Sequence, residues 1–320
     1  MSRVLFMGTP DFAVPVLNAL VRSGYEVCAV VTQPDKPTGR RQRLTSPPVK
    51  VAAQALGLVV LQPVRVRQPE ALQEIAALQP DVIVTAAYGQ LLPQALLDIP
   101  RVGCLNIHAS LLPRWRGAAP IHRALLAGDT TTGVTIMEMV LSLDAGPIVA
   151  QESMDIYPTD NVEALHNRLA ALGADMLVDV LPRYLDGELP LRAQPEEGVT
   201  YAGKITAEDE RIDWNQSAVA VFNQIRGLSP WPVARTSYNG QPLKVWDAQL
   251  PKEAPPEFPG QTDPMPPGQV VFTGKEVLVK CRPGWLQLIQ VQPAGKRSMA
   301  AADWLRGVTA KTVQLGAGQL

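Results

Sequence analysis

Short apolar runs alternate with longer segments of helical periodicity through roughly the first two hundred residues of the chain. The runs are almost uninterrupted, which is typical of strands buried on both faces of a parallel sheet; they cover residues 4–8, 27–32, 58–62, 81–87 and 103–108. Residues 68–79 and 118–129 have helical spacing, and Thr9 with Pro10 predicts the N-cap and first residue of another helix. This alternation predicts a doubly wound α/β domain.

The pattern changes beyond residue 130. Two strand-like runs, residues 133–140 and 148–156, flank the turn "SLDAGP" and predict a hairpin, and residues 161–185 predict a long helix. Residues 191–209 combine proline, glycine and charge, which is typical of a linker. We therefore divide the chain into a first domain of residues 1–190, this linker, and a second domain of residues 210–320.

The second domain has a mainly β pattern. Residues 217–228 predict one helix, and Asn239 with Gly240 predicts a hairpin turn. A loop with seven prolines, residues 251–268, precedes the strand-like residues 269–281 and 285–292. These features predict a small, barrel-like β domain.

Composition narrows the class of protein. The chain has 320 residues, of which 46% are apolar and 18% charged, so two domains with sizeable cores can form. No apolar run is long enough to span a membrane, and the run before Gly8 is too short for a signal peptide. The three cysteines are far apart and form no CxxC pair, which indicates reduced thiols. We expect a cytoplasmic protein without a membrane partner.

Charge is distributed unevenly along the chain. The net charge is −1, but residues 211–320 hold twelve basic and seven acidic residues, a net of +5. The first fifty residues hold seven basic residues against three acidic ones. Such an excess permits a polyanionic partner, although it does not identify one.

Two hydrogen-bonding side chains interrupt the apolar run of residues 103–108. Asn106 and His108 alternate, so they project from the same face of the predicted strand, at the end where parallel sheets bind ligands. An amide donor beside an imidazole suits a reaction in which a carbonyl becomes an oxyanion. The alternative is a pair of satisfied polar groups at a strand end, and the spacing alone favours neither.

Asp144 lies in the turn "SLDAGP", where its carboxylate either caps the turn or holds His108 in the protonated form. The other two histidines, His122 and His166, lie on predicted helices, where a structural or exposed role is the simpler interpretation. Cys104 is not favoured as a nucleophile. Neither GxGxxG nor GxxxxGK[ST] follows the first strand, which weakens a nucleotide-cofactor interpretation.

A basic loop follows the second predicted strand. Residues 35–50 hold five basic residues between proline and glycine positions, and the segment is long for a strand-to-helix connection. Solvated charge is the usual explanation of a basic run. An insertion of this length at a ligand-binding edge is more often functional, however.

Several stretches carry a resemblance that covers the whole chain. In the first domain they are "FMGTPDFAVPVLNAL", "VVTQPDKPTGR", "AAYGQLLP", "NIHASLLPRWRGAAPI", "GVTIMEM" and "LDAG", and in the second "RIDW", "SPWP", "KVW" and "QPAGK". With these motifs the chain resembles the methionyl-tRNA formyltransferase family of folate-dependent enzymes. Ser142 and Ala145 stand beside Asp144 where this family would lead us to expect Gly and Thr, which concerns only the geometry of the turn.

The resemblance implies a Rossmann-like formyltransferase domain followed by an OB-like barrel that binds tRNA. It also implies formyl transfer from 10-formyltetrahydrofolate to the methionine amine of initiator methionyl-tRNA, for translation initiation, without a metal. Asn106 and protonated His108 would stabilise the oxyanion, and Asp144 would keep His108 charged and help to move the proton to the folate nitrogen. The implied binding residues are Tyr88, Gly89, Ser110, Leu111, Leu112 and Pro113 for folate, and Lys36, Arg40, Arg41 and Arg43 for tRNA.

Three other functions are compatible with parts of the pattern. A folate-dependent formyltransferase could act on a small amine, such as a nucleotide sugar or glycinamide ribonucleotide, but the basic second domain argues against it. A non-catalytic RNA-binding protein would not need Asn106, His108 and Asp144 together. A dehydrogenase would need the glycine loop that the sequence lacks. We expect a monomeric enzyme.

Overall fold

The computed structural model describes residues 2–38, 42–252, 265–310 and 312–316. The chain divides into two compact units, each described by itself below. The first unit holds Met1–Pro120, Thr131–Asp155 and His166–Ala202, and the second holds Ile121–Thr130, Ile156–Leu165 and Gly203–Leu320. No helix among the described residues is long and apolar enough to cross a membrane.

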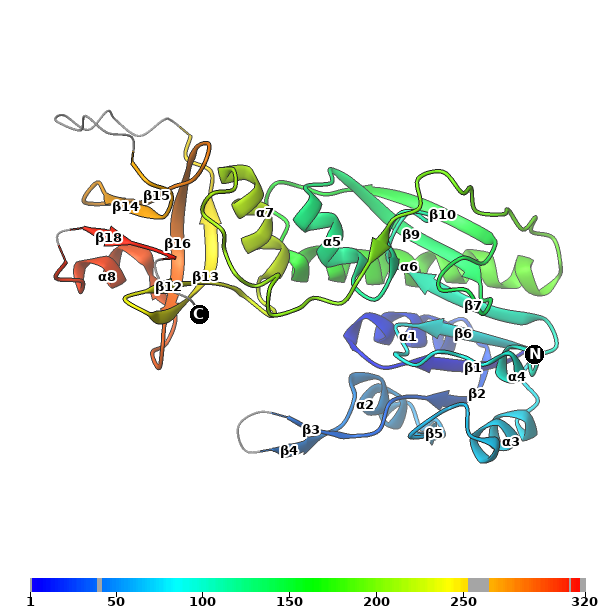
Figure 1. Ribbon diagram of the computed structural model, residues 1–320. Coiled ribbons are helices and arrows are strands. Elements are labelled where there is room, and N and C mark those ends of the chain that lie inside the picture. Colours follow the sequence, from blue (N-terminus) through cyan, green and yellow to red (C-terminus); the bar gives the residue numbers. More distant parts are fainter. Residues whose placement is uncertain (1, 39–41, 253–264, 311, 317–320) are drawn as a thin grey trace. The chain divides into compact units, whose positions relative to one another are not determined.

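The first unit is built on a sheet of seven strands in the order β10-β9-β7-β6-β1-β2-β5. Five of them, from β7 to β5, run parallel, β9 runs antiparallel to β7, and β10 runs antiparallel to β9. The predicted parallel sheet and the hairpin at its edge are therefore confirmed, and Figure 1 shows β6, β1 and β2 side by side. The strand bounds are β1 Arg3–Gly8, β2 Glu26–Val31, β5 Val60–Leu61, β6 Val82–Ala86, β7 Gly103–His108, β9 Thr131–Glu138 and β10 Ile148–Asp155.

Helices α3, α5 and α6 begin and end close to the positions that the spacing predicts, whereas α2 and α4 are not predicted. The helix bounds are η1 Asp11–Ala13, α1 Val14–Arg22, α2 Pro48–Ala55, α3 Pro69–Ala77, α4 Gln94–Leu97, α5 Pro120–Ala127 and α6 Val162–Leu185. The predicted helix start at Thr9 and Pro10 is wrong. The chain first makes the 3-10 turn η1, whose N-cap is Pro10, and the Thr9 hydroxyl makes tertiary hydrogen bonds: it donates to the Tyr88 carbonyl at 2.7 Å and accepts the Gln33 N–H at 3.4 Å.

Burial explains why the sheet is parallel and continuous. Every residue of β6 is buried, and so are five of the six residues of β1, because other elements cover both faces of these strands. Helix α6 approaches β7 closely at Gly173, where an added Cβ would meet the Ile107 side chain at 2.7 Å. Since side chains alternate along a strand, α6 covers the face of β7 opposite to Asn106 and His108.

Two short pairings add to the first unit. Strands β3 (Lys36–Thr38) and β4 (Arg43–Thr45) form an antiparallel hairpin, so the described part of the predicted basic loop has regular structure. Strands β8 (Arg116–Gly117) and β11 (Tyr201–Ala202) pair in parallel. Residues 192–202, which lie within the expected linker, are thus bonded to the first unit, also through the antiparallel bridge of Ile148 with Arg192.

The second unit contains an antiparallel, curled β half-barrel in the strand order β12-β13-β16-β15-β14-β18, with β17 paired to β16. The predicted turn at Asn239 and Gly240 is confirmed: both residues have positive φ, as a two-residue hairpin turn requires. The strand bounds are β12 Ala234–Tyr238, β13 Gln241–Gln249, β14 Gln269–Phe272, β15 Val277–Lys280, β16 Trp285–Pro293, β17 Met299–Ala300 and β18 Val313–Gln314.

Two helices pack on this half-barrel, α7 (Ala218–Leu228) and the short α8 (Ala301–Arg306). Helix α7 begins where the Ser217 hydroxyl accepts from the Ala220 N–H at 3.1 Å, a side-chain N-cap. Its apolar face joins one core with the inward side chains of the strands, including the buried Trp214, Leu228, Val245 and Leu286. This core is separate from the sheet of the first unit, as two domains require.

Candidate active site

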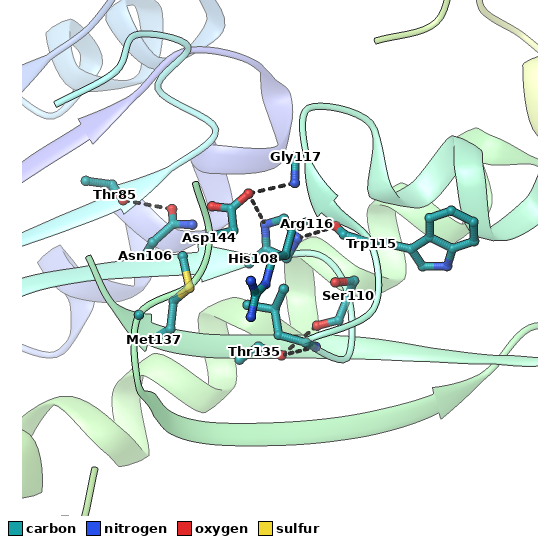
Figure 2. A network of polar contacts seen from close by, with 12 residues as sticks. Thr85, Asn106, His108, Ser110, Trp115, Arg116, Gly117, Thr135, Met137 and Asp144 are labelled. Carbon is teal, nitrogen blue, oxygen red and sulfur yellow. Dashed lines mark hydrogen bonds and ion pairs between the residues drawn. The ribbon is translucent and has the colours of Figure 1, made fainter. Parts of the chain in front are cut away.

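Strand β7 presents Asn106 and His108 on one face, as the alternation predicts. Thr85 lies in the neighbouring strand β6 and pairs with Asn106. The Thr85 hydroxyl donates to Asn106 Oδ1 at 2.7 Å. This bond fixes the orientation of the amide, because Oδ1 is the atom held by Thr85. Figure 2 shows the amide nitrogen on the other side, facing Asp144 and His108. Asn106 therefore offers N–H donors toward the imidazole.

Both nitrogens of the His108 ring face oxygen atoms. Nε2 lies 2.9 Å from the carbonyl oxygen of Trp115, which can only accept, so Nε2 carries a proton. Nδ1 lies 3.8 Å from Asp144 Oδ2. A doubly protonated imidazolium has a donor on each nitrogen and so complements both oxygens. Nδ1 is the nitrogen that remains free to turn its proton to a substrate.

Asp144 belongs to the connection between β9 and β10, residues 139–147. Its Oδ2 accepts the Gly117 N–H at 2.7 Å, and its backbone φ is +46°, a conformation that Asp and Asn tolerate better than most residues. Gly146 passes so close to the Glu138 carbonyl that a Cβ there would overlap the oxygen. The positive φ at Asp144 and the lack of room for a Cβ at Gly146 explain the Asp and the Gly of the motif "LDAG".

The three polar residues form one group, which we call the triad: Asn106, His108 and Asp144. His108 is buried, and Asn106 and Asp144 are half-buried. The side chain of His108 is 6% exposed and that of Asp144 is 12% exposed. Low exposure strengthens the interaction between a carboxylate and an imidazolium, because little water screens them. The carboxylate of Asp144 faces His108 and accepts the N–H of Gly117 in β8, which is not part of its own turn, so this contact is not the turn cap that the sequence offered as an alternative.

A glutamine from the expected linker completes the surroundings of Asp144. Gln194 Nε2 donates to the carbonyl oxygens of Asp144 and Gly146, each at 2.8 Å. Its Oε1 accepts from the Arg116 guanidinium, at 3.0 Å from Nε and 2.6 Å from Nη2. All hydrogen-bonding groups of this amide are therefore used within the site.

The turn after His108 is held by strands β9 and β10. The Thr135 hydroxyl donates to the Ser110 carbonyl at 2.6 Å and accepts the Leu112 N–H at 3.1 Å. Gln151 Nε2 donates to the Leu112 carbonyl at 2.9 Å. Ser110 and Leu112 are buried, and Leu111 and Pro113 are half-buried, so this turn presents a rigid edge beside the triad (Figure 2).

A second turn, at the end of β6, carries two of the predicted folate-binding residues. Gly89 is exposed, whereas the Tyr88 ring is buried in the apolar core, and burial raises the pKa of its hydroxyl to about 12. Among the described residues, the Tyr88 hydroxyl has no hydrogen-bond partner. Leu91 in the same turn is 81% exposed, so an apolar side chain faces outward here.

Other reactive side chains lie away from the triad or are unsuited to the chemistry. Burial, and then the Glu138 and Asp98 carboxylates, raise the pKa of the Cys104 thiol to about 12, so it stays protonated at neutral pH and is no nucleophile. His166 packs on Phe12, and His122 packs on Trp231 in the second unit. Within the described ranges, no group of three His, Cys, Asp or Glu residues could hold a metal ion.

Comparisons with known proteins match both units. Residues 2–181 match the formyl transferase family, and residues 204–309 match the formyl transferase C-terminal domain. A Bacillus licheniformis protein named methionyl-tRNA formyltransferase is 50% identical over 308 residues, covering 96% of this chain and 95% of that protein. The chain belongs to the methionyl-tRNA formyltransferase family. The protein of that name from Bacillus subtilis is 48% identical over 308 residues, again 96% of this chain and 95% of its own length.

Solved structures share the formyltransferase fold. An N-formyltransferase from Helicobacter canadensis, in complex with folinic acid and dTDP-3-aminofucose, has a TM-score of 0.67 and 16% identity, with 92% of this chain and 100% of that chain covered. HypX from Aquifex aeolicus, in complex with tetrahydrofolic acid, has a TM-score of 0.64 and 17% identity, with 95% of this chain and 46% of that chain covered. At these identities the likeness establishes the fold alone, and it confirms the predicted formyltransferase architecture.

The basic segment of this family member is anchored at its base. Lys36 and Arg43 are exposed on strands β3 and β4, whereas Arg40 and Arg41 lie outside the described residues. Asp35 accepts from Lys50 Nζ at 2.8 Å and from Gln62 Nε2 at 2.8 Å, just before β3 begins. We call residues 36–45 the basic hairpin.

Sequence reasoning missed the residues that orient the formyltransferase triad. Thr85 is the one polar residue of the apolar strand β6, the kind of signal that singled out Asn106, and it could have been found by it. Thr135 shares β9 with other polar residues, so this signal is weaker there. Gln194 had no such signal, because it lies in an irregular segment. Its role depends on contacts with Asp144 across about fifty positions of sequence.

Proposed function

We propose that this protein transfers the formyl group of 10-formyltetrahydrofolate to the α-amino group of methionine on initiator methionyl-tRNA. The observation that carries the proposal is the convergence of Asn106, His108 and Asp144. It occurs in a chain related over almost its whole length to proteins named methionyl-tRNA formyltransferase. The product would serve translation initiation, and we place the enzyme in the cytoplasm with its tRNA substrate.

The turns on either side of the triad fit a folate. Ser110 to Pro113 offers a rigid edge next to His108, and the turn of Tyr88 and Gly89 adds an exposed apolar side chain at Leu91. The backbone of these turns, exposed at Gly89, supplies polar groups. A folate needs both an apolar surface for its ring system and polar groups for orientation, as small-molecule sites generally provide. 10-Formyltetrahydrofolate supplies the formyl group.

The donors of the triad suit the charge that develops on the formyl oxygen. As the methionine nitrogen bonds to the formyl carbon, that oxygen becomes negative, and N–H donors aimed at it lower the barrier. Thr85 holds the Asn106 amide so that its nitrogen faces His108, and Trp115 engages Nε2 of His108, which leaves Nδ1 as the second donor. We infer that Asn106 Nδ2 and His108 Nδ1 bind the formyl oxygen together.

Formyl transfer also moves one proton. The bond from the formyl carbon to the folate nitrogen breaks, and a proton from the methionine amine replaces that carbon. The Asp144 carboxylate, with Oδ2 3.8 Å from His108 Nδ1, places a negative charge beside the ring, and a small approach of the two groups would let it relay the proton. The Gly117 N–H keeps the carboxylate in this position. Each step uses groups of this chain alone, so no metal is required.

The basic parts of the chain fit the tRNA. Lys36 and Arg43 are exposed on the basic hairpin, and residues 211–320 carry a net charge of +5. The sequence between Lys36 and Arg43 adds two further cations, Arg40 and Arg41, which lie outside the described residues. Lys and Arg side chains bind phosphates and release counterions, a sequence-independent contribution to affinity. We infer that the hairpin contacts the acceptor end and that the second unit holds the backbone. Because the triad comes from one chain, a monomer suffices.

The test is a transfer assay with labelled formyl donor. Incubation with methionyl-charged initiator tRNA should place the label on the tRNA, and uncharged tRNA should receive none, because it lacks the methionine amine. A nucleotide-linked amino sugar and glycinamide ribonucleotide serve as small-amine acceptors. Label on these acceptors but not on the charged tRNA would replace the proposal with a small-amine formyltransferase.

A further inference from the structure

We propose that residues 192–202, which we call the strap, position the triad, with Gln194 acting on Asp144 and Thr200 acting on His108. The inference rests on the proposed function, since it assigns further residues to that reaction. Neither residue needs to touch a substrate. Each would be a positioning residue that acts through hydrogen bonds to the backbone on which the triad depends.

Gln194 clamps the connection that carries Asp144. Its amide nitrogen donates to two carbonyls that lie two residues apart, those of Asp144 and Gly146, both at 2.8 Å. Asp144 has a φ of +46°, which costs a non-glycine residue free energy unless its surroundings hold it. The two hydrogen bonds from Gln194 hold the Asp144 backbone in this conformation, next to the carboxylate that faces His108.

The oxygen of the same amide secures Arg116. Oε1 accepts both from Nε and from Nη2 of the guanidinium, a charge-assisted interaction. The residue after Arg116 is Gly117, whose N–H binds the Asp144 carboxylate at 2.7 Å. Gln194 thus fixes Asp144 twice, through its backbone carbonyl and through the segment that holds its side chain.

Thr200 provides the link to His108. Its hydroxyl accepts the Trp115 N–H at 2.9 Å, and its carbonyl accepts the Arg116 N–H at 2.9 Å. The carbonyl of Trp115 in turn lies 2.9 Å from His108 Nε2. Trp115 has a φ of +64°, unusual for a bulky residue, so its peptide orientation depends on such partners. Hydrogen bonds therefore connect the strap both to Asp144 and, through Trp115, to His108.

Backbone pairing holds the strap itself at both ends. Arg192 exchanges N–H and C=O hydrogen bonds with Ile148, at 2.7 and 2.9 Å. Tyr201 and Ala202 pair with Arg116 and Gly117. With its ends fixed, the strap can transmit a defined geometry to the residues between them, as groups that support a catalytic site must.

The test compares two variants of Gln194. Gln194→Leu removes the clamp and the acceptor for Arg116, whereas Gln194→Glu keeps an acceptor for Arg116 but loses both donors to the carbonyls. Because small displacements of catalytic groups slow the chemistry, we expect both variants to lower kcat by roughly 10- to 100-fold. KM for charged tRNA and for the folate donor should change little. A Gln194→Glu variant with normal kcat would overturn the clamp.

Gln224 offers a matched control in the second unit. Its amide nitrogen also donates to two carbonyls, those of Asp209 and Arg211, at 2.8 and 2.7 Å, and neither belongs to the triad. Gln224→Leu should lower the melting temperature about as much as Gln194→Leu but leave kcat unchanged. An equal loss of kcat in both variants would make the effect of Gln194 one of general stability, and the proposal would be wrong.

Hydrogen exchange gives a readout that does not depend on activity. Amides of residues 142–147 should exchange faster in Gln194→Glu than in the wild type, while they should be unaffected in Gln224→Leu. Thr200→Val, which keeps the side-chain volume, should lower kcat and speed exchange at Trp115. Unchanged exchange in these segments would overturn the strap proposal, whereas a wild-type protein without formylation activity would overturn the proposed function alone.

Discussion

Two strands of the first sheet lead into residues that are proposed to bind substrates, and the residues after one strand differ from those after the other in burial and in their contacts. After β7 the side chains are buried, and His108 and Asp144 have fixed partners on neighbouring elements. After β2 the chain forms the basic hairpin, whose described residues Lys36 and Arg43 are exposed. The hairpin is held mainly at its base, where Lys50, Gln62 and Ser46 bind Asp35.

The difference follows from what each region has to bind. A developing charge on one oxygen is stabilised only by donors that are already in place, since reorganisation during the reaction costs free energy. Phosphates along a tRNA are many and equivalent, so long flexible cations suffice. Changes in the triad should therefore affect kcat, whereas changes in the hairpin should affect KM for tRNA.

The largest effect should come from the triad donors. His108→Ala or Asn106→Ala should lower kcat by roughly 10²-fold or more, because each removes one donor to the developing oxyanion. Steady-state kinetics with saturating charged tRNA measures this, and circular dichroism checks the fold. His166→Ala is the matched control, since His166 packs on Phe12 and not on the triad. Near-normal turnover of His108→Ala would contradict the mechanism.

Asp144→Asn should come next. Asn tolerates the positive φ of this position and can still accept the Gly117 N–H, so the turn keeps its shape while the charge is lost. Without the carboxylate, the negative charge that faces His108 Nδ1 is lost, so kcat should fall by roughly tenfold. A kcat like that of the wild type would reduce Asp144 to a residue that only accepts the Gly117 N–H.

Thr85→Val should have a smaller effect of the same kind. Valine has nearly the same volume, so the strand stays packed, but the hydroxyl that fixes Asn106 Oδ1 is removed. The amide can then rotate, and kcat should fall by roughly two- to tenfold, in line with the loss of one hydrogen bond. Thr32→Val is a matched control, because the Thr32 hydroxyl is buried and has no partner among the described residues. Equal kinetics for both variants would contradict the orienting role of Thr85.

The triad also shows how much the sequence can predict. The strand and the shared face of Asn106 and His108 followed from alternation alone, because a period of two leaves no choice of face. The approach of Asp144 did not follow from it, since it depends on a nine-residue connection with a residue of positive φ. The turn motif left two interpretations of Asp144 open, the family resemblance favoured the one beside His108, and the geometry supplies the reason.

The same contrast explains the errors and the omissions. Thr9 followed by Pro10 has the chemistry of a helix start, but the Thr9 hydroxyl bonds the Tyr88 carbonyl and the Gln33 N–H, and Pro10 is the N-cap of η1. The hairpin β3–β4 is only three residues long on each side, too short for periodicity to reveal. Gln194 was hidden because local sequence carries no information about an amide that bridges distant backbone carbonyls.

Neutralising the basic hairpin should raise KM rather than lower kcat. Replacement of Arg40, Arg41 and Arg43 by Gln should raise KM for charged tRNA severalfold. The slope of the logarithm of the binding constant against the logarithm of the salt concentration should also become shallower, by about one unit for each phosphate that the hairpin no longer neutralises. Binding measured at several salt concentrations checks this, with folate affinity as the internal control. Arg22→Gln, on helix α1 outside the hairpin, serves as the charge control. An unchanged salt slope would mean that the hairpin is only solvated charge.

The smallest effect should come from the base of the hairpin. Hydrogen bonds from Gln62, Lys50 and Ser46, in that order, hold the pKa of Asp35 below its usual value. A carboxyl with a depressed pKa stabilises the folded state above its unfolded pKa of about 4, and this stabilisation is lost as pH falls through the lower folded value. Asp35→Asn should therefore remove at pH 7 the stabilisation that the wild type loses only in acid.

In this variant, amides of residues 36–38 and 43–45 should exchange faster. KM for tRNA should rise roughly two- to fivefold, as expected for a partly exposed ion pair with added hydrogen bonds. Glu26→Gln, which breaks an ion pair with Arg3 elsewhere on the sheet edge, should leave both unchanged. If Asp35→Asn behaved like Glu26→Gln, the hydrogen bonds to Asp35 would not hold the hairpin, and tRNA binding would not depend on the base of the hairpin.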